Sequence, residues 1–258
     1  MNIRTFVLVT VFILSCAWSL MAAQGLYWES TVTAVGSQQN TKTFYLPKKL
    51  KTIAAQGHEV IILLDKQLMI NINPDDSTYS ELGFAEMEGA MKSSAAKMDA
   101  NVGALKETMK TMPEDQRKQM EKMMEVMEVM GVGGESKPWE VVATSERKKV
   151  SGYACRKYIL KQGERDAATV WATEEIAEFA SMKKDFEEFS KQMMSMNPMG
   201  RELATAMRKI DGFPIEAAMG EGIRTVVTRV EARTIDPEEF AVPKGYKKLP
   251  SPMLQKQQ

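Results

Sequence analysis

The chain has 258 residues, and its 34 basic side chains balance its 34 acidic ones, so the formal net charge is zero. Without net charge the chain offers no global attraction to nucleic acid, which we exclude as a partner, while association with a membrane surface stays open. The chain has a single histidine, His58, which follows a glycine turn. Metal clusters that need several histidines are therefore excluded, and so are catalytic triads based on histidine. We therefore expect a protein that is not an enzyme and needs no cofactor.

The first 23 residues have the pattern of a secretory signal peptide. A positively charged start (residues 1–4) precedes an uncharged apolar run (residues 5–14), and small residues end at Ala23. We expect cleavage near Ala23 and a periplasmic or secreted protein. Two alternatives stay open: an uncleaved membrane anchor, and lipidation at Cys16, where the sequence loosely resembles a bacterial lipobox. After cleavage Cys155 is the single cysteine, so no internal disulfide can form.

Residues 25–81 are predicted to form short antiparallel strands. Tyr27, Trp28 and Thr31 are strand formers, and the polar residues 36–40 are typical of a turn. The continuous apolar run at residues 60–64 is typical of a strand that is covered on both faces. The segment therefore predicts a meander of strands joined by short connections.

The composition changes to helix formers between residues 84 and 130, and we predict a helix pair there. Residues 111–114 interrupt it as a capping box, with Thr111 as N-cap and Pro113 in the first turn. The second helix carries one methionine face at helical spacing. Its members are Met120, Met123, Met124, Met127 and Met130.

The second half of the chain repeats the alternation of strands and helices. We predict strands for residues 138–173, helices for residues 174–209 with Thr173 as the first cap, and a closing hairpin for residues 212–235. The tail, residues 248–258, is predicted to be disordered. The pattern predicts one α+β domain over residues 24–247 behind the signal peptide.

No residue pattern points to catalysis. The paired carboxylates Glu174 and Glu175, like Glu187 and Glu188, lie at a helix start or on a polar face, where they favour the helix dipole or water. Cys155 lies in a strand-like stretch, without the positive charge and helix N-terminus that would lower its pKa. We expect a buried and inert thiol.

Methionine is the outlier of the composition, with 21 residues concentrated in the predicted helices. Three interpretations stay open. Methionine fills irregular gaps in a core, but a face of flexible thioethers also suits a cavity or groove that receives variable apolar partners. Thioethers also bind Cu(I), and pairs such as Met120 with Met123 have a spacing of one helical turn.

Two regions of the chain, residues 144–173 and residues 240–246, resemble a known family. Residues 144–158 follow the pattern T-x-E-x-K-x-I/V-x-G-Y-x-C-x-K-Y, residues 171–173 follow as a W-x-T strand end, and residues 240–246 match F-x-V-P-x-G-Y. They resemble exported bacterial proteins of unknown function that are similar to the LolA/LppX group of lipoprotein and lipid carriers. The resemblance implies a curved antiparallel half-barrel with helices as a lid over an apolar cavity. Within the motif we interpret Gly152 as a site of close approach and Tyr153 as a half-buried strand residue.

These observations predict an α+β fold, a LolA-like half-barrel whose methionine-rich helices are inserted between strands as a lid. The leading hypothesis is a non-enzymatic envelope protein that binds a lipid, an acyl chain or a lipoprotein-like partner between sheet and helices. Alternatives are a Cu(I)-binding periplasmic protein and a structural or interaction protein with a fully packed core. The residues expected to line the cavity are Met91, Met120, Met123, Met124, Met127, Phe179, Phe186 and Phe189.

Overall fold

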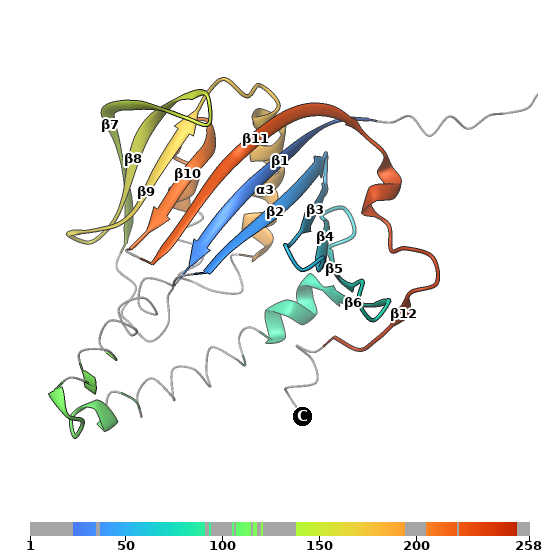
Figure 1. Ribbon diagram of the computed structural model, residues 1–258, viewed down its shortest axis with the longest axis horizontal. Coiled ribbons are helices and arrows are strands. Elements are labelled where there is room, and N and C mark those ends of the chain that lie inside the picture. Colours follow the sequence, from blue (N-terminus) through green and yellow to red (C-terminus); the bar gives the residue numbers. More distant parts are fainter. Residues whose placement is uncertain are drawn as a thin grey trace, which may run out of the picture.

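The computed structural model describes the strand regions and part of the helices. The described residues are 23–34, 37–90, 93, 105, 107–114, 116–117, 120, 138–193, 205–220 and 222–251, with the backbone alone for 190–193. Within them the chain forms one twelve-stranded sheet with a long helix on one face (Figure 1). The predicted signal peptide lies outside the described residues, apart from Ala23, which begins the first strand.

The elements follow one another in this order: β1 (Ala23–Ala34), β2 (Ser37–Leu46), β3 (Lys49–Ile53), β4 (Glu59–Leu63), β5 (Leu68–Asn73), β6 (Thr78–Gly83), β7 (Trp139–Val150), β8 (Tyr153–Gln162), β9 (Arg165–Thr173), α3 (Phe179–Met193), β10 (Phe213–Met219), β11 (Ile223–Ile235), the 3-10 helix η1 (Pro237–Phe240) and β12 (Lys247–Lys248). Residues 84–90 and 205–207 are also helical.

The sheet consists of two meanders that meet at their longest strands. β1 to β6 pair in chain order, and so do β7 to β11. β1 pairs antiparallel with β11 from Ala23–Ile235 to Ala34–Ile223, which joins the meanders into one sheet. The pairing is antiparallel except for the short β12, which runs parallel to β6. In the described part of the chain β7 and β12 form the two edges, so the sheet is open.

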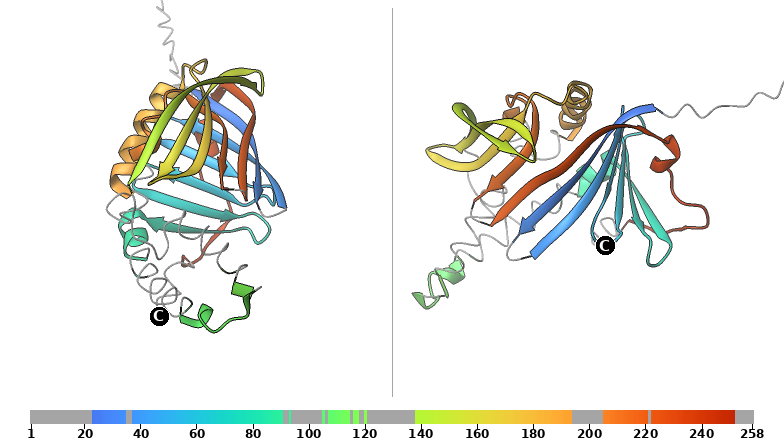
Figure 2. Two further views of the ribbon diagram at one scale, coloured as in Figure 1. Left: turned by 90° about the vertical axis from the view of Figure 1, so that its left-hand side faces the viewer. Right: turned by 45° about the horizontal axis from the view of Figure 1, so that its top comes forward.

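Two elements, α3 and η1, cover the first meander on opposite faces. Figure 2 shows the bent sheet with α3 along one side. Leu26 and Tyr45 pack in one cluster with Met182 of α3. Tyr27 and Phe44, their neighbours along the strands, pack in another cluster with Phe240 of η1 and its neighbours. This alternation is what a strand produces when both of its faces are covered.

The apolar run at residues 60–64 largely forms β4, and both of its faces are covered, as predicted. Ile61 is completely buried in the cluster beneath η1. Ile62 points the other way and packs against a cluster of Leu82, Phe84 and Met87, at the start of the helical residues 84–90. The predicted helical region thus begins where its composition indicates.

Two element boundaries differ from the prediction. The polar residues Ser37 to Asn40 belong to β2, because pairing with β1 extends the hairpin to Ala34 and Ser37. The helix predicted from residue 174 begins at Phe179. The Thr173 hydroxyl accepts a hydrogen bond from the Glu175 backbone N–H at 3.3 Å, but a looped segment follows before the helix. Local composition therefore misplaced the start of β2 and the start of α3 by several residues.

The start of the tail is ordered, contrary to the prediction. The Leu249 backbone N–H donates to the Tyr79 carbonyl at 2.8 Å, Lys248 forms an ion pair with Glu81, and Ser251 is buried. These contacts hold the tail against the start of the β6 edge and cover part of it. Residues 252–258 lie outside the described residues.

Of the predicted helix pair, the structure describes residues 84–90 and short pieces between 93 and 120. The predicted interruption is present at residues 110–113, where the Thr111 hydroxyl donates to the Thr108 carbonyl at 2.9 Å. The methionine-rich lid stays a prediction, since residues 121–137 lie outside the described part. Among the helices that are described, none has both the length and the apolar character that a bilayer crossing requires.

Candidate ligand cavity

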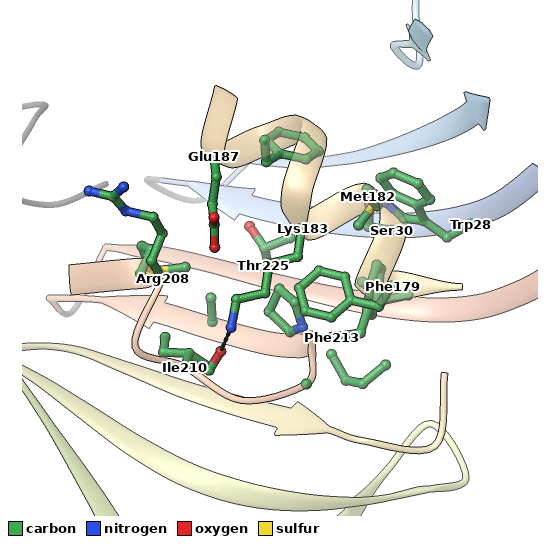
Figure 3. Close-up of a pocket in the computed structure, with 17 residues that line it drawn as sticks. Trp28, Ser30, Phe179, Met182, Lys183, Glu187, Arg208, Ile210, Phe213 and Thr225 are labelled. Atoms are coloured by element: carbon green, nitrogen blue, oxygen red, sulfur yellow. Dashed lines mark hydrogen bonds between the residues drawn. The ribbon is translucent and has the colours of Figure 1, made fainter. Parts of the chain in front are cut away.

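A cavity of about 610 Å³ lies between α3, the segment 205–212 and strands β1, β10 and β11 (Figure 3). Its walls are mainly apolar. The lining residues are Trp28, Ser30, Phe179, Met182, Lys183, Phe186, Glu187, Met207, Arg208, Ile210, Gly212, Phe213, Pro214, Ile215, Ala217, Thr225 and Val227.

The strand side of the cavity combines small residues with large ones. Ser30 and Ala217 lie among the lining residues together with Trp28 and Phe213. Phe213 braces the space, because its ring meets Trp28 edge-on at 5.6 Å and Phe179 at 5.5 Å between ring centres. Such edge-to-face contacts stabilise a fixed arrangement of rings. The aromatic cluster therefore ties the first turn of α3 to β10 and β1.

Further along α3, a buried carboxylate ties the helix to the first meander. Asp185 accepts hydrogen bonds from the Tyr45 hydroxyl at 2.9 Å and from the Lys48 backbone N–H at 2.6 Å. The Lys48 ammonium lies 2.9 Å from the second Asp185 oxygen and also pairs with Glu188. We call Tyr45, Lys48 and Asp185 the latch.

The latch shifts the protonation of its own members. Burial would raise the pKa of Asp185, but hydrogen bonds from the backbone and side chain of Lys48 and from Tyr45 outweigh it and hold the pKa below its ordinary value. Burial, together with the nearby Asp185 charge, raises the pKa of Tyr45 to about 12. Asp185 is thus charged and Tyr45 neutral at physiological pH, which is the state that the latch needs.

Two more contacts fix the cover. The Phe189 ring packs against Phe84 at 5.3 Å between ring centres, which ties α3 to the helical residues 84–90. The Lys183 ammonium donates to the Ile210 carbonyl at 3.2 Å, from α3 across to the segment that closes the cavity. These contacts therefore fix α3 to the helical residues 84–90 and to the segment that closes the cavity.

The structure brings two of the predicted cavity residues together. Phe179 and Phe186 line the cavity, and Phe189 lines a smaller hollow beside it with Tyr45 and Leu50. Met120 is half-buried and is not among the lining residues of the described cavity. Met91, Met123, Met124 and Met127 lie outside the described residues. For the cavity that is described, the cover is α3 with residues 205–210.

Sequence reasoning missed the strand side of the cavity. Met182 lies on the predicted apolar face of its helix, and Phe213 and Ile215 lie in the predicted hairpin, so their periodicity was available as a signal. The sequence around Trp28 contains no pattern that indicates a place in the cavity. Trp28 reaches the cavity because β1 pairs with β11, more than 180 residues later in the chain.

The motif around Cys155 has a structural role. Cys155 is completely buried, which confirms the predicted burial, and burial raises the pKa of its thiol. Ser151 and Gly152 form a tight turn with φ angles of +51° and +90°. A Cβ at Gly152 would meet no atom within 4 Å, so the interpretation of Gly152 as a site of close approach is wrong. The glycine is favoured because this turn requires positive φ.

The tip of this hairpin is bound to the central strand. The Ser151 hydroxyl donates to the Val227 carbonyl at 2.6 Å, and the hydroxyl of the half-buried Tyr153 donates to the Val230 carbonyl at 3.4 Å. β10 pairs with β11 at residues 223–226, so Val227 and Val230 lie beyond that pairing. The motif therefore satisfies backbone acceptors next to the cavity strand.

Conventional metal ligands do not gather in the described part of the chain, where no three His, Cys, Asp or Glu side chains could share an ion. The Cu(I) hypothesis rests on methionines that, apart from Met120, lie outside the described residues, so it stays a prediction.

The family described as "Domain of unknown function (DUF4412)" matches residues 85–246, more than half of the chain. The chain belongs to this family. The matched region contains both motif stretches and the α3, β10 and β11 walls of the cavity, whereas β1, with Trp28 and Ser30, precedes it. No curated protein matches the chain.

Solved structures show distant likenesses. PNGF-II is 10% identical with a TM-score of 0.39, and the match covers 91% of this chain and 32% of that one. MucB in the Pseudomonas aeruginosa MucA/MucB complex is 7% identical with a TM-score of 0.41, covering 89% of this chain and 59% of that one. This chain thus spans less than two thirds of the length of either protein.

Proposed function

We propose that the protein is a non-enzymatic binding protein of the cell envelope that holds an apolar ligand in the cavity beneath α3. The ligand would be a lipid, an acyl chain or the acylated part of a partner protein. The observation that carries the proposal is a largely apolar cavity of about 610 Å³ under a tethered helix. Cavities that hold small ligands have volumes of roughly 300–1,000 Å³ and mainly apolar walls.

Exposed apolar side chains at the cavity support this proposal. In the part of the chain that the structure describes, three large hydrophobic residues are exposed, and two of them, Phe186 (40%) and Met207 (36%), line the cavity. Contiguous exposed apolar surface is found at ligand-binding grooves. Phe186 and Met207 would meet the apolar part of a ligand as it enters.

The proposal extends to the fold and the location. An open, bent antiparallel sheet with a helix across one face is compatible with a LolA-like carrier, although the cover of the described cavity is α3. The location in the envelope rests on the signal-peptide pattern of residues 1–23.

The direct test is to purify the protein without detergent, extract it with organic solvent and identify bound lipid by mass spectrometry. Delipidated protein should then bind a fluorescent fatty acid. If extraction yields no lipid and the delipidated protein binds no fluorescent fatty acid, the proposal is wrong.

A matched pair of variants locates the binding. Ala217→Phe places a ring in the cavity and should reduce fatty-acid binding by at least about tenfold, with a small change in melting temperature. Ala218→Phe is the control, since neighbouring strand residues point to opposite faces. Equal binding by both variants would place the ligand elsewhere.

A further inference from the structure

We infer that the ligand is a single-chain amphiphile with a singly charged anionic head group, held at Lys183 with its chain toward Trp28. The inference rests on the proposed function and specifies the chemical class of the ligand. It depends on how the charged side chains are distributed within the cavity.

Lys183 is a cation in largely apolar surroundings. Its ammonium donates to the Ile210 carbonyl at 3.2 Å, and among the ion pairs of the described residues it takes part in none. An ammonium group has three donors, and a partly desolvated charge is costly without a counter-charge. An anionic group bound beside Ile210 would supply both an acceptor and a negative charge in direct contact with the ammonium.

The cavity has an aromatic end and a polar end. Figure 3 shows Trp28, Phe179 and Met182 gathered on one side of the site, and Arg208 on the other, with Lys183 between them. A ligand with an apolar chain and a charged head fits this gradient in one orientation. The chain would contact the aromatic side chains, and the head would face Lys183 and Arg208.

The charges also limit the head group. Glu187 follows Lys183 by one helical turn and lines the same cavity, so two basic residues stand against one acidic residue. The resulting single positive charge matches a head group with one negative charge, such as a carboxylate or a phosphodiester. A dianionic head would meet repulsion from Glu187, and a cationic head would meet two like charges.

The test compares three ligands with the same chain and different head groups: dodecanoate, dodecanol and dodecyltrimethylammonium. Each ligand is used below its own critical micelle concentration to displace a bound fluorescent fatty acid. Dodecanoate should bind tightest. Lys183→Gln should weaken the binding of dodecanoate about tenfold and leave the binding of dodecanol unchanged, because a charged hydrogen bond is lost. Glu187→Gln should strengthen the binding of dodecanoate several-fold. Lys184 is an exposed neighbour outside the cavity lining, so Lys184→Gln is the control and should leave the binding of all three ligands unchanged.

The orientation is tested by fluorescence quenching. A fatty acid brominated at the chain end should quench Trp28 more strongly than one brominated beside the carboxylate, and Trp28→Phe should remove that difference. Stronger quenching by the bromine near the carboxylate would reverse the orientation and overturn the inference.

The outcomes separate the inference from the proposed function. If the three ligands bind equally and Lys183→Gln has no effect, the anionic head group is wrong, while apolar ligand binding stands. If none of the three binds, the proposed function and the inference are both wrong. Tighter binding of dodecyltrimethylammonium that Glu187→Gln abolishes would assign a cationic ligand instead.

Discussion

The two meanders of this sheet share one backbone pattern but are covered differently. In the first, branched aliphatic residues lie on both faces, with Ile61 and Ile72 toward η1 and Ile62 toward the helical residues 84–90. In the second, the cavity lies between β10 and α3, and β10 lines it with the small Ala217 as well as the larger Phe213 and Ile215. The hollow beside η1 is smaller, about 310 Å³, and is lined partly by charged residues.

The comparison teaches that the fit between strand side chains and their cover, rather than strand pairing alone, decides where this protein is solid and where it is hollow. Side chains that interdigitate with a cover exclude space, and a gap remains where they do not reach it. Four pairs of substitutions can break or sharpen this contrast.

The largest effect is expected at the turn into β10. Gly212 has a φ of +89°, and a Cβ there would lie 2.3 Å from the Thr173 carbonyl oxygen. Gly212→Ala should therefore lower the free energy of unfolding by about 3 kcal/mol or more, measured by urea denaturation. Gly152→Ala is the control, since its φ is similarly positive but the space is open, and should cost about 1 kcal/mol. Equal losses would show that the close approach to Thr173 does not matter.

The second prediction contrasts the two covers directly. Ile61→Ala should cost about 3 kcal/mol, because Ile61 is completely buried in a packed cluster. Phe186→Ala should cost less than about 1 kcal/mol, since its ring is 40% exposed beside the cavity. Binding of a fluorescent fatty acid should follow the opposite order, with a several-fold loss for Phe186→Ala alone. A large stability loss for Phe186→Ala would argue that the cavity is filled in solution.

The third prediction concerns the latch between α3 and the first meander. Asp185→Asn should lower the free energy of unfolding at pH 7 by about 1–2 kcal/mol, because three donors lose a charged acceptor. Glu188→Gln, at an exposed partner of Lys48, should cost less than about 0.5 kcal/mol.

The latch also predicts a pH dependence. Because folding lowers the pKa of Asp185, its contribution is complete above the unfolded value of about 4 and is lost as the pH falls through the lower folded value. The stability difference between wild type and Asp185→Asn should therefore shrink toward zero in acid. Denaturation curves across that range would contradict the latch if the difference stayed constant.

The smallest effect is expected at the hairpin tip of the second meander. Ser151→Ala removes the hydrogen bond to the Val227 carbonyl and should cost about 0.5–1 kcal/mol. Tyr153→Phe should cost less, since its hydrogen bond to Val230 is longer, at 3.4 Å. Hydrogen exchange at the β11 amides would report whether the tip stabilises the strand behind the cavity.

The sequence was sufficient for features that depend on neighbours along the chain. Periodicity and turn residues place the strands of both meanders, the closing hairpin and the start of the helical region at residue 84. The apolar run around Ile61 correctly indicates two covered faces, and the surroundings of Cys155 correctly indicate a buried thiol. In each case the signal lies within a few residues, where strand and helix periods differ.

The site needed information that no local pattern contains. Trp28 joins the cavity through the pairing of β1 with β11, and Asp185 meets Tyr45 across 140 residues of sequence. The tail is ordered because it pairs with the edge of β6. A cavity is the difference between the volume that backbone elements enclose and the side chains that fill it. That difference depends on how distant segments come together, so the space beneath α3 emerged only from the folded chain.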